Sequence, residues 1–156
     1  MRPTLFPLVA LLAAAPLAAQ TPAPAAPPAA APAPVKLTAE QEAKMAALGK
    51  TYTRWFLGGQ ADSLATAFDA EMLTKVQGVG GITEMMGQIA DRAGFQTKVI
   101  AEKMTYRNGK PQYWHEAEFS ELAGESLVIR WIFSPEGKII GAGINPKSAA
   151  PKPDGL

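Results

Sequence analysis

The sequence predicts an α+β domain in which three N-terminal helices precede a twisted four-stranded antiparallel sheet. Up to Gly94, apolar residues recur at steps of three and four, the spacing that gathers them on one face of a helix. After Gly94 the period falls to two, in stretches rich in aromatic and β-branched residues. Because all the helices come before all the strands, we expect consecutive hairpins packed with one face against the helices.

The first predicted helix begins at Thr38 and Gln41, which have the spacing of a capping box, and ends at Gly58. Its apolar stripe consists of Met45, Leu48, Tyr52, Trp55 and Phe56. A second helix is predicted over about 61–77 and a third over about 82–93. Between them the sequence GVGG indicates a helix stop, and it lacks the lysine of a phosphate-binding loop.

Four stretches read as strands: FQTKVIAEKMTY, PQYWHEAEF, SLVIRWIF and KIIGAGI. Asn108-Gly109 and the sequence PEG at 135–137 are turn signals at two of the three connections. SLVIRWIF alternates poorly between apolar and polar residues, so both faces of that strand should be covered. Either a homodimer through the sheet or a ligand cavity would cover the second face.

The ends of the chain, which has 156 residues, differ from the domain at 37–147. Residues 1–19 read as a signal peptide, with one basic residue before an apolar run too short to span a bilayer stably. An uncleaved anchor is the alternative. Residues 20–36 form a disordered Pro/Ala-rich linker, acting as a tether or a simple leader, and 148–156 a disordered tail. We expect an exported protein, periplasmic or extracellular, with no membrane contact after signal cleavage.

Composition excludes several function classes. The formal net charge is +1 and no Lys/Arg cluster stands out, which argues against nucleic acid as a partner. The absence of cysteine excludes disulfides, thiolate nucleophiles and Cys-ligated zinc. One histidine and scattered acids do not make a transition-metal site, so we predict no metal and no cofactor.

The only histidine, His115, has a predicted carboxylate neighbour. If Asn108 and Gly109 are the two central turn residues, the register of the hairpin is fixed. The opposed pairs are then Met104 with Tyr113, Glu102 with His115, and Ile100 with Ala117. Glu102 would orient His115 for acid/base work, and Arg130 on the next strand would join this face as an oxyanion donor if the register holds. The alternative is a hydrogen-bonded structural histidine.

Several segments resemble the nuclear transport factor 2-like superfamily. They are GKTYTRWFLGGQADSLATAFDAEML, VIAEKMTYRNGKPQYWHEAEF and IRWIFSPEGKIIGAGINP, within about Glu42 to Pro146. Within that superfamily the chain resembles small exported domains of unknown function that occur alone or beside serine hydrolase domains. The resemblance implies a cone in which a curved sheet wraps the helices and leaves a pocket at its open end. Ketosteroid isomerases, polyketide cyclases, dehydratases and plain binding or dimerisation modules use such pockets.

Two functions follow as hypotheses. The first is a non-catalytic module that binds a small apolar ligand or a protein partner, possibly itself, through the pocket and the sheet. The expected ligand-binding residues are Tyr52, Trp55, Phe56, Met86, Tyr113 and Trp131. The second is an isomerase, cyclase or hydratase that uses Glu102 and His115 in an apolar pocket, with Tyr52, Tyr113 or Arg130 as donors. Catalysis requires that Glu102 and His115 meet at a cavity, and a packed interior would argue against it.

Overall fold

The computed structural model describes residues 37–154, all of which fall in one compact unit. The predicted signal peptide at 1–19 and linker at 20–36 lie outside the described residues. The described part is α+β: its helices come first and a four-stranded antiparallel sheet follows, as predicted. None of the helices within 37–154 combines the length and apolar character needed to cross a membrane.

Four α-helices replace the three that were predicted. They are α1 (Ala39–Leu57), α2 (Ala61–Ala65), α3 (Ala70–Lys75) and α4 (Gly78–Ala93). The predicted capping box is present at α1, where the Thr38 hydroxyl accepts from Gln41 N and the Gln41 side chain accepts from Thr38 N. The predicted helix at 61–77 is broken, because Phe68 bridges to Ile139 and Asp69 caps a new helix by accepting from Met72 N.

The prediction that the GVGG sequence is a helix stop is wrong, because this sequence forms the first turn of α4. The residue before it, Gln77, has a left-handed backbone with φ of 61° and separates α3 from α4. Gly81 lies so close to the end of α3 that a Cβ there would be 1.9 Å from the carbonyl oxygen of Val76. Gly78, with φ of 67°, and Gly81 therefore allow a tight corner between α3 and α4.

The sheet consists of four strands in the order β1-β2-β3-β4: β1 (Gln96–Arg107), β2 (Lys110–Phe119), β3 (Leu127–Phe133) and β4 (Ile139–Pro146). Asn108 and Gly109 both have positive φ, so they form the predicted two-residue turn. Glu102 pairs with His115 as predicted. The predicted pairing of Ile100 with Ala117 is wrong, because a register shift between Val99 and Ala101 puts Val99 opposite Ala117.

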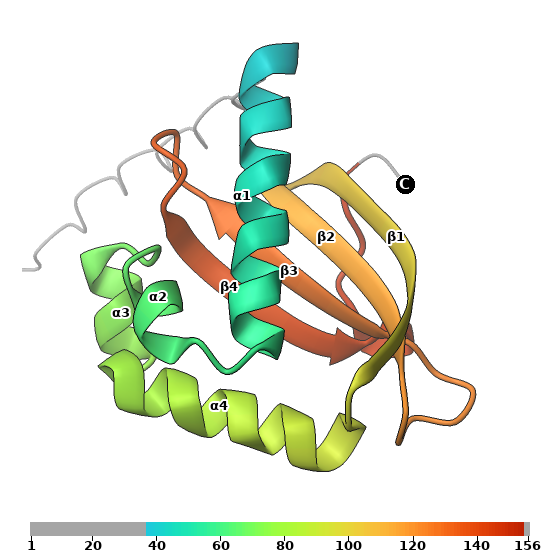
Figure 1. Ribbon diagram of the computed structural model, residues 1–156. Helices are drawn as coiled ribbons and strands as arrows, with labels where there is room; N and C mark the ends of the chain where they lie inside the picture. Colours follow the sequence, from blue (N-terminus) through green and yellow to red (C-terminus); the bar gives the residue numbers. More distant parts are fainter. Residues whose placement is uncertain (1–36, 155–156) are drawn as a thin grey trace, which may run out of the picture. The chain divides into compact units, whose positions relative to one another are not determined.

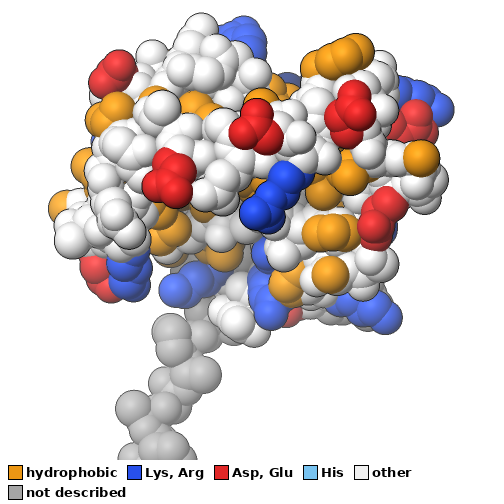
Figure 2. All heavy atoms as spheres, turned by 90° about the horizontal axis from the view of Figure 1, so that it is seen from below, with side chains coloured by type: hydrophobic (Ala, Val, Ile, Leu, Met, Phe, Trp, Pro, Cys, Tyr) orange, Lys and Arg blue, Asp and Glu red, His pale blue; other side chains and the backbone are white. Residues whose placement is uncertain are grey.

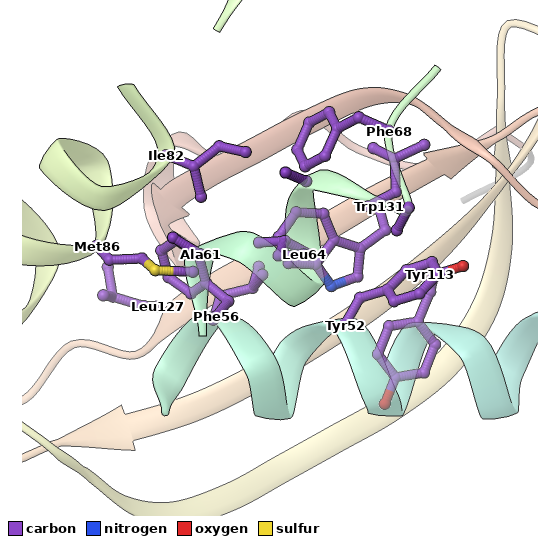
Figure 3. Packing of buried hydrophobic residues seen from close by; sticks show 14 of the residues in the cluster. Tyr52, Phe56, Ala61, Leu64, Phe68, Ile82, Met86, Tyr113, Leu127 and Trp131 are labelled. Carbon is purple, nitrogen blue, oxygen red and sulfur yellow. The ribbon is translucent and has the colours of Figure 1, made fainter. Parts of the chain in front are cut away.

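Helix α1 lies across one face of the sheet, here called the inner face (Figure 1). The helix buries Met45, Gly49, Tyr52, Thr53 and Phe56. Trp131 on β3 is completely buried, donates from Nε1 to Thr53 Oγ1 at 2.8 Å and packs edge-on against Phe56. Figure 3 shows these rings converging with Leu64 and Tyr113 in a single core. The apolar stripe read from the sequence therefore does attach α1 to the sheet.

The chain after β4 covers part of the outer face, opposite α1 (Figure 1). Lys147 pairs with Glu116 and lies over the ring of Trp114, while Asp154 N donates to Tyr106 O at the far end. The predicted loose tail from Ser148 is thus held against the sheet as far as Asp154. The segment after β4 therefore helps to bury the outer face of the sheet. From the sequence we expected a homodimer or a ligand cavity to cover this face, and the homodimer stays a prediction.

Helix α1 approaches the sheet closely at Gly49, where an added Cβ would be 2.2 Å from Tyr113 Cγ. Gly49→Ala should therefore lower the free energy of unfolding by about 1–3 kcal/mol, the usual effect of overpacking a core. Gly87→Ala is the matched control, because Gly87 also lies inside a helix and has open space around it. That control should gain up to about 1 kcal/mol from helix propensity. Urea denaturation measures both, and equal stabilities would contradict the Gly49–Tyr113 contact.

Candidate functional site

Three elements bring polar side chains together at the inner face. In β2, Tyr113 and His115 are two residues apart, so both point toward α1, and the hairpin register sets Glu102 of β1 opposite His115. Lys50 reaches the same point from α1, one residue after the close approach at Gly49. The sequence predicted the Glu102–His115 pair, and the structure brings the two side chains into contact.

The Glu102 carboxylate is the centre of this cluster. Its Oε1 atom accepts from the Tyr113 hydroxyl at 2.7 Å and lies 3.2 Å from His115 Nδ1. Its Oε2 atom lies 2.9 Å from Lys50 Nζ. The Glu102 side chain is 28% exposed, whereas that of His115 is 4% exposed. One partly exposed carboxylate thus joins α1, β1 and β2.

The carboxylate determines which imidazole nitrogen carries the proton. A neutral imidazole has one N–H, and an ionised Glu102 can only accept, so the proton resides on Nδ1. Nε2 then carries the lone pair, and the atom 2.7 Å from it is Gln96 Oε1. Because an amide oxygen and an imidazole lone pair both only accept, this tautomer requires the Gln96 amide to be turned by 180°, so that its NH₂ group donates to Nε2. The basic nitrogen of His115 therefore faces Gln96, at the wall of a pocket.

Burial and hydrogen bonding act in opposite directions on these groups. Burial lowers the pKa of His115 below its usual value, outweighing the Glu102 carboxylate, which raises it. Burial alone would raise the pKa of Glu102, but hydrogen bonds from Tyr113, Lys50 and His115 lower it overall. The pKa of Tyr113 is raised, first by burial and then by Glu102. At neutral pH the site therefore holds a neutral imidazole, an ionised carboxylate and a protonated phenol.

A cavity of about 450 Å³ opens beside this cluster. We call it the His115 pocket, and its lining residues are Lys50, Thr53, Arg54, Leu57, Gly58, Gln96, Val99, Glu102 and His115. Its volume falls within the range of about 300–1,000 Å³ that is usual for small-molecule sites. Apolar side chains, one buried imidazole and two cations share its wall, so it can hold a small molecule with both apolar and polar parts.

The structure contradicts the role predicted for Arg130. Arg130 pairs with Trp114, whereas His115 pairs with Ile129, so Arg130 and His115 lie on opposite faces of the sheet. The arginine is buried there and donates to Asn145 Oδ1 at 3.1 Å. The prediction required that the loop between β2 and β3 keep the strand register that puts Arg130 on the face of His115. The observed register differs by one residue, so Ile129 and not Arg130 lies on that face. Arg130 cannot act as an oxyanion donor in the His115 pocket.

The six residues predicted to bind a ligand have different surroundings. Phe56 and Met86 line a second cavity, described below, but Trp131 and Tyr52 belong to the core, where the Tyr52 hydroxyl bonds to Gly137 O at 3.3 Å. Trp55 is partly buried and packs on Tyr52 with ring centroids 5.6 Å apart. Tyr113 is 1% exposed, and its hydroxyl is engaged by Glu102. Tyr113 is therefore a support for Glu102 and not a lining residue.

Seven lining residues were missed: Lys50, Thr53, Arg54, Leu57, Gly58, Gln96 and Val99. Lys50 and Arg54 are spaced i, i+4 on the side of α1 away from the apolar stripe read from the sequence, so the stripe gave no signal that they lie beside the pocket. Val99 reaches the inner face only through the register shift in β1, which no turn signal announces. The side of the sheet on which Gln96 lies depends on where β1 begins after Gly94, and the sequence does not determine that position.

No group of three or more His, Asp or Glu side chains within residues 37–154 is arranged to hold a metal ion. No protein-family model matches this chain, and no curated protein or solved structure matches it either. The geometry of the site is therefore the basis for the function proposed below.

The burial of His115 has a consequence for stability. Its pKa in the folded protein lies below the value of about 6.5 expected for the unfolded chain, so the unfolded chain binds more protons in between. The free energy of unfolding should be highest above that value and fall as the pH drops through this interval. Because His115 is the only histidine, His115→Gln should make the free energy of unfolding nearly independent of pH in this interval. The loss of stability at lower pH that comes from protonation of carboxylates should remain. Urea midpoints from pH 8 to 5 measure this, and a wild type that gains stability on acidification would contradict it.

Proposed function

We propose that this protein binds a small molecule in the His115 pocket, between α1 and the inner face of the sheet. The observation that carries the proposal is the cavity of about 450 Å³, whose wall combines apolar side chains with a partly buried polar cluster. Such a mixture is typical of ligand sites, because the apolar wall provides affinity and a few fixed polar groups provide orientation. In this proposal the protein is exported and acts outside the cytoplasm.

The proposal includes membership of the nuclear transport factor 2-like superfamily, with the sheet bent round the helices as a cone. Helices followed by a four-stranded antiparallel meander, with α1 against one face, support this membership. In that superfamily the space between helix and sheet hosts many different chemistries, so the fold identifies no reaction. The lining residues of this chain have to identify its ligand.

A matched pair of substitutions on β1 tests ligand binding. Val99 lines the His115 pocket, whereas its neighbour Ile100 is similarly exposed and lines a different pocket, with Glu118 and Ser126. In a thermal-shift screen of small apolar and amphipathic compounds, at least one compound should raise the melting temperature of the wild type and of Ile100→Trp. Val99→Trp fills the pocket and should abolish the shift. A shift that survives in Val99→Trp, or no shift with any compound, would contradict the proposal.

A second candidate function is proton transfer from a carbon acid, with His115 as the general base. The observation that favours it is the hydrogen bond of 3.2 Å between Glu102 and Nδ1, which leaves the Nε2 lone pair at the pocket wall. A neutral imidazole can take a proton from a carbon next to a carbonyl and return it to the same molecule at another position. Displacement of the Gln96 amide by the substrate would give Nε2 access to that proton.

Deuterium exchange tests the second function. The probe is 2-octanone in D₂O, in which the protein should accelerate exchange at the carbons beside the carbonyl, followed by proton NMR. His115→Gln should slow the exchange about 10²–10⁴-fold, the usual contribution of a general base. The rate should also fall as the pH drops below the lowered pKa of His115. Equal exchange rates for the wild type and His115→Gln would contradict the catalytic function and would not affect the proposal that the pocket binds a small molecule.

A further inference from the structure

A second cavity of about 340 Å³ shares two lining residues with the His115 pocket. We call it the Phe95 pocket, and its lining residues are Phe56, Leu57, Met86, Ile89, Ala90, Gly94, Phe95 and Gln96. Leu57 and Gln96 line both cavities, so the two spaces adjoin at the end of α1. Gln96 supplies the only polar side chain of the Phe95 pocket. We call the two adjoining cavities together the groove, of which the Phe95 pocket is the apolar end and the His115 pocket the polar end.

Exposed apolar side chains gather along this groove. Five large apolar side chains of the described part of the chain are exposed, and three of them line the two pockets: Leu57 at 38%, Phe95 at 71% and Val99 at 44%. Seen from the side of α4, apolar groups lie between charged ones on the surface (Figure 2). Apolar groups concentrated at the rim of a groove mark a site that an apolar molecule covers.

The polar end carries an excess of positive charge. Lys50 and Arg54 both line the His115 pocket, and Glu102 is the only acid in its wall. Lys50 is paired with Glu102, while Arg54 is exposed and makes no ion pair with any residue in 37–154. Since His115 is neutral at neutral pH, two cations face one carboxylate. This end of the groove therefore complements one negative charge.

We propose that the two pockets together bind a single-chain amphiphile with one anionic head, of the fatty-acid class. Its carboxylate lies at Arg54 and Lys50, and its apolar chain passes Leu57 into the Phe95 pocket. This inference rests on the proposed function, since it uses the same His115 pocket, and it adds the class of the ligand. An apolar chain would cover Phe95, and a carboxylate would give Arg54 a partner.

The test compares two probes of equal chain length, dodecanoate and dodecanol, below their aggregation limits and on the full-length chain by titration calorimetry. Dodecanoate should bind the wild type more tightly than dodecanol does. Arg54→Gln should weaken dodecanoate about tenfold, as expected for loss of a charge-assisted contact, and leave dodecanol nearly unchanged. Arg92→Gln is the control, because Arg92 is exposed in the last turn of α4 and lines neither pocket. Phe95→Ser should weaken both probes.

The outcomes separate the class of ligand from the proposed function. Equal affinity for the two probes, with no effect of Arg54→Gln, overturns the anionic head but leaves binding in the pocket standing if Val99→Trp still blocks it. Failure of both probes overturns the amphiphile class, while another compound that Val99→Trp excludes would keep the proposed function. Dodecanoate binding that Val99→Trp and Phe95→Ser leave unchanged overturns the assignment of this ligand to the groove. Unchanged unfolding midpoints of the variants confirm that the fold is intact.

Discussion

The arrangement of the site depends on one carboxylate, that of Glu102, which three elements share. The Tyr113 ring lies directly beneath Gly49 of α1, and its hydroxyl donates to Glu102. Lys50, the next residue of α1, forms an ion pair with the same Glu102 carboxylate. The absence of a side chain at Gly49 lets the helix approach closely enough for both contacts. The crossing point of α1 on the sheet and the charge state of the site thus have a common origin, and the His115 pocket opens beside it.

The balance of charge in the site follows from the competition for this carboxylate. An isolated Glu–His pair on a sheet would raise the pKa of the imidazole, because the carboxylate favours the imidazolium. Here Tyr113 and Lys50 also bind the carboxylate, and the imidazole is 4% exposed, so burial decides and the pKa of His115 falls. The result is a fixed, neutral base with one nitrogen at the pocket wall. Such a group serves equally as a hydrogen-bond partner for a ligand and as a proton acceptor.

The sequence predicted the parts of the fold that local chemistry determines. Asn108-Gly109 determines the register of the first hairpin, so the Glu102–His115 contact was predictable without a structure. The side on which Val99 and Arg130 point was not, because both depend on irregularities between strands: a register shift in β1 and the length of the β2–β3 connection. The break at Asp69 was also missed, although Asp69 is an ordinary helix cap, because its cause is a pairing with Ile139 from the far end of the chain.

The properties of the site depend on which nitrogen of the His115 imidazole carries the proton, and nitrogen NMR measures this directly. The chain has a single histidine, so a long-range ¹H–¹⁵N correlation spectrum of the uniformly labelled protein contains one imidazole pattern. At pH 7 we expect a protonated Nδ1 and an Nε2 with the shift of an unprotonated nitrogen. A proton on Nε2, or a spectrum of the imidazolium with both nitrogens protonated, would contradict this expectation.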